Sequence, residues 1–132
     1  MPLKLTLKPH ERIIIGGAVI KNGVSSCHLL VENNVPILRQ ADIMSESEAN
    51  SPSRRIYFAI QLLYIDSEKN VELQSVFYKL ARDVMDAAPS MKDLISGISQ
   101  LIIEKKLYQA LKIAKKLIQY EEELLRNVSK SS

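Results

Sequence analysis

The side chains able to do chemistry in this sequence are few, and most of them are cations. His10 and His28 are its 2 histidines, and Cys27 is its 1 cysteine. Their separation matches no zinc-ligand spacing. The consecutive glutamates at 121–123 point in different directions around a predicted helix, which indicates a solvated face rather than an acid–base pair. The sequence therefore predicts a protein that is not an enzyme and holds no metal or cofactor.

Six polar residues are candidates for binding a polyanion such as RNA. Three share the polar face of a predicted N-terminal strand because they alternate with leucines, and one ends a later strand. Two open a predicted helix, where backbone N–H groups favour anions. The candidates are Lys4, Thr6, Lys8, Arg39, Arg54 and Arg55. The alternatives are that the strand cations protect a sheet edge from aggregation and that the arginine pair is a solvated helix start.

A second group of cations lies near the C-terminus. Residues 105–116 contain five lysines and no acidic residue, namely Lys105, Lys106, Lys112, Lys115 and Lys116. Such a group is usually the solvated side of an amphipathic helix, but it is also a possible polyanion surface. The pattern by itself does not decide whether the strand cations or these lysines would bind RNA.

The N-terminal third of the chain has the pattern of short strands and turns. Leucines alternate with polar residues over 3–8, and a β-branched run at 12–15 ends in Gly16-Gly17, whose residues accept positive φ. Asn22-Gly23 is typical of a hairpin turn and predicts that residues 18–21 pair with residues 25–32. A fifth short strand is expected at 37–39.

The rest of the chain has the pattern of helices, beginning with a central one. Ser51-Pro52 is a helix start, and residues 56–65 are apolar except for Gln61 and the tyrosine hydroxyls. A helix apolar on nearly all sides is normally buried, so both of its faces should be costly to alter. Replacing Gln61 should matter little unless its amide is buried and paired. Further helices are expected from 71 to about 88, from 90, and from 107 to about 126, with a corner at Lys105-Lys106.

These elements predict an α+β fold. It consists of a small antiparallel β module of about five short strands at 1–48, followed by a bundle of about four helices at 49–132. The tail from about residue 128 should be disordered. A β module this small rarely buries a face by itself, so it needs the helices or a second copy.

Composition is that of an ordinary globular chain. Its 132 residues are 46% hydrophobic and 25% charged, with a net charge of +3, which permits nucleic-acid binding without indicating it. A single cysteine fits a reducing compartment. The N-terminus does not have the pattern of a signal peptide, and no stretch is long enough to span a membrane, so a cytoplasmic protein is expected.

Three stretches resemble one known family. They are LKLTLKPHERIIIGGAVIKNG at the start, ANSPSRRIYFAIQLLYID in the middle and LYQALKIAKKLIQYEEELL near the end. Together they resemble the flagellum biosynthesis repressor family, FlbT, over nearly the whole chain. The resemblance implies a small cytoplasmic bacterial protein that controls flagellin synthesis after transcription. It also implies association with the untranslated leader of flagellin mRNA, alongside a second small flagellar regulatory protein.

The first 44 residues are similar in layout to the carbon storage regulator, an all-β translational repressor. The motif of that protein falls on residues 5–8 and then 9–11, and a later strand motif falls on Arg39 and Ile43. This resemblance implies an intertwined homodimer that binds RNA along its first and last strands. The chain departs from the motif at Leu7, where the repressor has arginine, and at residues 40–41, where acids would follow.

The sequence therefore favours a post-transcriptional regulator that binds the 5′ leader of flagellin mRNA as a homodimer. The alternative is a protein-interaction adaptor, in which the helical hairpin at 90–126 binds a flagellar partner protein and any effect on RNA is indirect.

Overall fold

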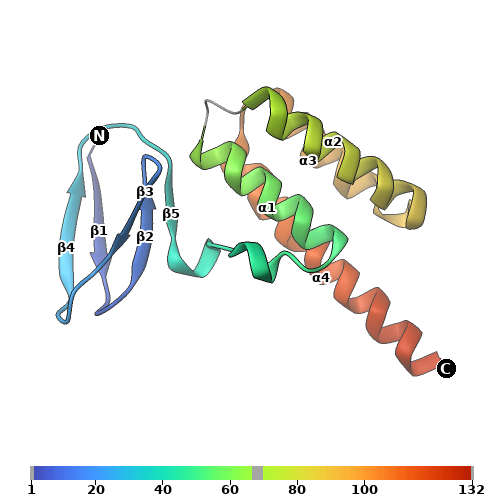
Figure 1. Ribbon diagram of the computed structural model, residues 1–132, viewed down its shortest axis with the longest axis horizontal. Helices are drawn as coiled ribbons and strands as arrows, with labels where there is room; N and C mark the ends of the chain where they lie inside the picture. Colours follow the sequence, from blue (N-terminus) through green and yellow to red (C-terminus); the bar gives the residue numbers. More distant parts are fainter. Residues whose placement is uncertain (1, 67–69, 132) are drawn as a thin grey trace. The chain divides into compact units, whose positions relative to one another are not determined.

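The computed structural model describes residues 2–66 and 70–131, which divide into two compact units, Met1–Ile43 and Met44–Ser132 (Figure 1). The first unit contains antiparallel strands and the second contains helices. The predicted α+β fold is confirmed. The sequence pattern predicts a unit boundary at 48/49, whereas the structure includes residues 44–48 in the helical unit. Met44 belongs there because both of its backbone polar groups are hydrogen-bonded to Gln61.

The strands of the β unit form two small antiparallel sheets within the described residues. β1 (Leu3–Leu7) pairs with β4 (Cys27–Val31), and β2 (Arg12–Ile15) lies between β3 (Ala18–Lys21) and β5 (Ile37–Arg39). Alternation along β1 buries Leu5 and Leu7 and leaves the polar residues between them exposed. Both leucines pack with Ile13 into a small core.

The hairpin predicted at Asn22-Gly23 is wrong, because β3 and β4 belong to different sheets. The tight hairpin lies at Gly16-Gly17, where φ is +57° and +88°, and it joins β2 to β3. Asn22 instead holds the loop together: its side-chain amide donates to the carbonyl oxygens of Lys8 at 2.8 Å and Ser25 at 2.9 Å. The two N–H groups of an asparagine amide can donate to carbonyl oxygens of a loop as well as to those of a tight turn. The local sequence does not distinguish these roles.

The helical unit is built around α1 (Pro52–Ile65). α1 packs against α2 (Asn70–Ala87) and α4 (Leu107–Ser131), and α3 (Lys92–Ile103) packs against α4 (Figure 1). α1 starts as predicted: Pro52 occupies the first turn, and the Ser51 hydroxyl accepts a hydrogen bond from the Arg54 N–H at 3.3 Å. α4 is 25 residues long and continues past residue 128, where the sequence predicts a disordered tail.

The corner predicted at Lys105-Lys106 lies directly after Glu104, the C-cap residue of α3. The Lys106 N–H donates to the Leu101 carbonyl at 2.8 Å, and the Lys105 N–H donates to the Ile102 carbonyl at 3.0 Å. These are the two bonds of a Schellman motif, and Lys105 takes the left-handed conformation that the motif requires, with φ of +62°. The cap turns the chain sharply and starts α4 at Leu107.

Candidate nucleic-acid interface

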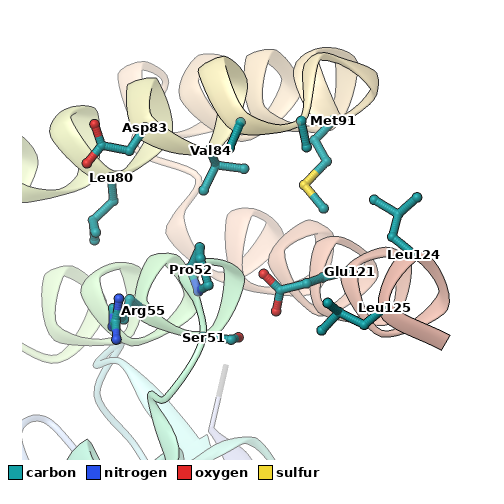
Figure 2. A pocket seen from close by; sticks show the side chains of 12 residues that line it. Ser51, Pro52, Arg55, Leu80, Asp83, Val84, Met91, Glu121, Leu124 and Leu125 are labelled. Carbon is teal, nitrogen blue, oxygen red and sulfur yellow. The ribbon is translucent and has the colours of Figure 1, made fainter. Parts of the chain in front are cut away.

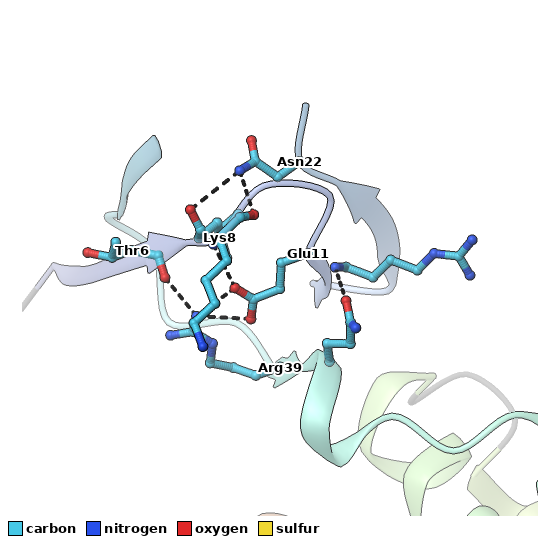
Figure 3. A network of polar contacts seen from close by, with 8 residues as sticks. Thr6, Lys8, Glu11, Asn22 and Arg39 are labelled. Atoms are coloured by element: carbon cyan, nitrogen blue, oxygen red, sulfur yellow. Dashed lines mark hydrogen bonds and ion pairs between the residues drawn. The ribbon is translucent and has the colours of Figure 1, made fainter. Parts of the chain in front are cut away.

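Arg39 holds the end of β1 and the turn after it against β5 (Figure 3). Its guanidinium donates to the Thr6 carbonyl oxygen at 2.7 Å and to both carboxylate oxygens of Glu11, at 3.0 and 3.2 Å. Glu11 also accepts the Lys8 N–H at 2.9 Å. The structure therefore brings Thr6, Lys8 and Arg39 together around the Glu11 carboxylate. It also shows an intramolecular role for Arg39, whose side chain remains 40% exposed.

These contacts lower the pKa of Glu11 below its ordinary value of 4.5. The first cause is the hydrogen bond from the Lys8 N–H, followed by the bond and charge of Arg39. Both partners stabilise the ionised carboxylate. The turn between β1 and β2 is therefore held by an acid that must stay charged.

We expect the β unit to open as the pH falls below about 4.5, through the lowered folded-state pKa of Glu11. The unfolded chain binds this proton more readily, so the stabilisation is present above the unfolded pKa and is lost on acidification. Hydrogen–deuterium exchange over residues 3–39 at a series of pH values measures this. Glu11→Gln should exchange faster than the wild type at pH 7, and the difference should shrink as the pH falls below 4.5, whereas the exposed control Glu32→Gln should follow the wild type throughout.

The polar face of β1 carries the remaining strand candidates. Lys4 and Lys8 are exposed, and the Thr6 hydroxyl shares a 3.0 Å hydrogen bond with the Nδ1 atom of His28, its neighbour across the pair of strands. This face offers two lysine ammonium groups and short polar groups on a regular strand. It has the chemistry to contact phosphate, but it has no phenylalanine, tyrosine or tryptophan side chain on which a base could stack.

Arg54 and Arg55 belong to the helical unit, so the six predicted residues are divided between the two units. Arg54 donates to Asn50 Oδ1 at 2.9 Å and to Glu122 Oε1 at 3.0 Å. Arg55 is exposed. The predicted arginine pair therefore consists of one residue held by an ion pair and one facing solvent.

The prediction that the glutamates at 121–123 form a solvated face is wrong for Glu121, whereas Glu122 and Glu123 are exposed. Glu121 is 9% exposed, and its Oε2 atom accepts the Ser53 N–H at 3.0 Å, in the first turn of α1. A carboxylate is stabilised there by an otherwise unsatisfied donor and by the positive end of the helix dipole. Glu122 pairs with Arg54. These partners are 68 residues away in sequence, so no local pattern could reveal them.

A second candidate surface lies on the N-terminal half of α4 and the corner before it. We call it the basic face, and it comprises Lys105, Lys106, Tyr108, Lys112, Lys115 and Lys116, all exposed. The Lys112 ammonium lies 5.0 Å from the Tyr108 ring centroid, and the Tyr108 and Tyr64 ring centroids are 6.0 Å apart. Cations beside exposed aromatic rings are typical of single-stranded RNA surfaces. Tyr108 is not among the residues predicted from the sequence, although its four-residue spacing to Lys112 is a usable signal.

Neither a metal site nor a membrane span is found in the described part of the chain. No group of three or more His, Cys, Asp or Glu side chains in 2–66 and 70–131 could hold a metal ion. No helix in the same ranges is long and apolar enough to cross a bilayer. The arrangement as a whole defines a small two-unit α+β protein with basic surfaces on both units.

Comparison with known proteins identifies the family of this two-unit protein. The family model described as flagellar protein FlbT matches residues 3–125. The chain belongs to the FlbT family, as the resemblance in its three stretches predicted.

Named relatives cover almost the whole chain. The probable flagellum biosynthesis repressor protein FlbT 1 of Bradyrhizobium diazoefficiens is 45% identical over 94% of this chain and 85% of its own length. A probable flagellum biosynthesis repressor protein FlbT of Rhodopseudomonas palustris is 38% identical over 95% of this chain and 98% of its own. The flagellum biosynthesis repressor protein FlbT of Caulobacter vibrioides is 35% identical over 98% and 93%. No solved structure matches the chain.

Proposed function

We propose that this protein represses flagellin synthesis after transcription by binding the 5′ untranslated leader of flagellin mRNA. The observation that carries the proposal is membership of a family whose relatives are named flagellum biosynthesis repressors. Exposed basic surfaces on a chain with a net charge of +3 are consistent with a polyanionic target. Because the target is mRNA, the protein would act in the cytoplasm.

Two surfaces are candidates for the RNA contact. The strand surface comprises Lys4, Thr6, Lys8 and Arg39. Arg54 and Arg55 form a separate group on the helical unit. On the strand, Glu11 offsets the charge of Arg39, which leaves the two lysines as the main phosphate contacts. The basic face has more lysines and an exposed aromatic ring, so it offers both phosphate contacts and base stacking.

An electrophoretic shift with flagellin leader RNA over a salt series tests the proposal and separates the surfaces. We expect Lys4→Ala with Lys8→Ala, or Lys112→Ala with Lys115→Ala and Lys116→Ala, to weaken binding. The variant at the true surface should flatten the slope of log affinity against log salt by about 0.7 for each phosphate group that is no longer neutralised. The control Lys79→Ala removes an exposed lysine of α2 and should leave the slope unchanged.

The outcomes differ clearly. Weaker binding in the strand variant alone assigns the site to the β unit, and weaker binding in the helix variant alone assigns it to the basic face. Binding of wild-type strength in both variants would exclude both surfaces as the RNA site. No salt-sensitive binding by the wild type would contradict RNA binding itself.

The second candidate function is an adaptor whose helical hairpin binds a partner, namely a second small flagellar regulatory protein. Ile103, at the end of α3, is 64% exposed, and Tyr108 is 42% exposed on the next helix. Exposed apolar groups of this size on one hairpin are consistent with a protein contact. In this case the effect on mRNA would be indirect.

We also propose that the β unit works as a homodimer. Val19, Val24 and Leu30 are 69%, 80% and 60% exposed, so the unit by itself leaves these apolar side chains in contact with water. An open hollow of about 540 Å³ in this unit has a largely apolar lining of Ile15, Gly16, Ile20, Leu29, Leu30, Val31, Glu32, Asn33 and Val35. A second β unit could cover it, since two small sheets bury little surface alone.

A further inference from the structure

Tyr108, in the first turn of α4, has an exposed ring that the helical unit holds in place. The residue is 42% exposed. Its ring centroid lies 6.0 Å from that of Tyr64, near the end of α1, and the two ring planes are tilted by 40°. Tyr64 is half-buried, so the exposed ring has a fixed neighbour. A tyrosine side chain also has few rotatable bonds and loses little conformational freedom on binding. Tyr108 therefore offers a preformed flat surface to a ligand.

The Lys112 ammonium shows which face of the Tyr108 ring a ligand can reach. Its nitrogen lies over the ring, 5.0 Å from the centroid, and the lysine is exposed. A lysine over a ring at an exposed site is a weaker contact than a nucleobase stacked on the same ring. A base can therefore take the place of the ammonium, which stays close enough to contact the phosphate of that nucleotide or the next.

Lysines follow Tyr108 along one side of α4. Lys112 and Lys116 come four and eight residues later, so both lie on the Tyr108 side of the helix at steps of about 6 Å. Residues 105–120 contain no acidic residue, and the carboxylate of Glu104, just before them, lies 3.8 Å from the Lys106 ammonium. A strand with one base on Tyr108 would therefore bring its next phosphate groups to Lys112 and Lys116.

The arginine pair at the start of α1 is less suited to RNA than the basic face. Arg54 forms an ion pair with Glu122. Arg55 lines an apolar groove of about 470 Å³, and the carboxylates of Asp83 and Glu121 line the same groove (Figure 2). Two carboxylates beside one guanidinium disfavour a polyanion. Within the helical unit, the observations therefore favour the basic face as the RNA site.

We propose that an unpaired base of the target RNA stacks on Tyr108, so that the protein binds a single-stranded segment in preference to a duplex. This inference rests on the RNA binding proposed above. Lysines contact the phosphates of either form, but a base inside a duplex is already stacked on both faces. Only a base in a loop, a bulge or a free end can lie on a protein ring. Tyr108 therefore supplies the preference for unpaired RNA.

Substitutions at Tyr108 separate stacking from charge. Binding of flagellin leader RNA, alone and annealed to its complementary strand, is measured over a salt series. We expect Tyr108→Leu to weaken binding of the single strand by about tenfold and to leave the slope of log affinity against log salt unchanged, since a stacked ring neutralises no phosphate. An unchanged slope also shows that the lysines remain in place. Tyr108→Phe keeps the ring and should bind like the wild type, and Tyr108→Leu should not affect binding of the duplex.

Tyr78→Leu is the matched control, because Tyr78 is 38% exposed and lies on α2, outside the basic face. It should bind the leader like the wild type. Photo-cross-linking of wild-type protein to leader RNA that contains 5-bromouridine, followed by mass spectrometry, should label Tyr108 and not Tyr78.

The outcomes distinguish this inference from the proposed function. Wild-type affinity in Tyr108→Leu, which is expected if Tyr108 contacts a partner protein instead, would overturn base stacking and leave RNA binding intact. An equal loss of affinity in Tyr78→Leu, or cross-links at Tyr78 alone, would also overturn it. Absence of leader binding by the wild-type protein would contradict both the inference and the proposed function.

Discussion

Replacing Ile60 by alanine should lower the free energy of unfolding of the helical unit by roughly 2–5 kcal/mol. Ile60 is fully buried, as is Ile56 one turn earlier, on the helix that packs against both α2 and α4. Removing its methyl groups forfeits their transfer free energy and leaves a cavity between three helices, which cannot all move to fill it. Urea denaturation followed by circular dichroism at a helical wavelength measures the change.

Two controls define what the Ile60 result means. Leu62→Ala should cost less than Ile60→Ala, because Leu62 is half-buried and not fully buried. The sequence alone predicts an equal loss of stability for Ile60→Ala and Leu62→Ala, which lie on different faces of this helix. Val71→Ala, at a residue 85% exposed, should change stability by under about 0.5 kcal/mol. If Ile60→Ala unfolds at the same urea concentration as Val71→Ala, α1 is not the centre of the unit.

Replacing Gln61 by alanine should cost about 2–3 kcal/mol, far more than an ordinary polar substitution. The side chain is 3% exposed, and its amide makes two hydrogen bonds to one residue. Gln61 Oε1 accepts the Met44 N–H at 2.8 Å, and Gln61 Nε2 donates to the Met44 carbonyl at 2.9 Å. Alanine would leave both backbone groups without these partners and would release the segment that leads into α1.

Gln100→Ala is the matched control for Gln61→Ala. The Gln100 amide is exposed, and its hydrogen bond to Glu104 is 3.5 Å long, so its removal should cost under about 0.5 kcal/mol. Both variants are measured by the same urea titration. Equal stability of the two would mean that water replaces both bonds to Met44. Faster hydrogen exchange of residues 44–50 in Gln61→Ala alone would identify the released segment.

Much of the fold could be predicted because local patterns specify it. Alternation at Leu5 and Leu7 fixes which face of β1 is buried, and Ser51-Pro52 fixes where α1 begins. The spacing of apolar residues along α4 predicts its buried seam. In each case the information lies within a few residues, and the structure has the element where the pattern places it. The α+β order of the chain follows from these local signals.

The tertiary structure decided which strands pair and which charges have partners. Asn22-Gly23 has the composition of a hairpin turn, but β3 and β4 pair with different strands, because both β1 and β2 need a partner to satisfy their backbone groups.

The same holds for the candidate site. The positions of Arg39 and Arg54 as cations could be predicted, but not that Glu11 and Glu122 hold them. Glu121 has the pattern of a solvated residue and is buried at the start of α1. These contacts join residues 28 and 68 positions apart, and the energy of a charge depends on what the folded chain places beside it. Sequence determines the elements and the charges they carry, and only the packed chain determines which charges are left exposed to a ligand.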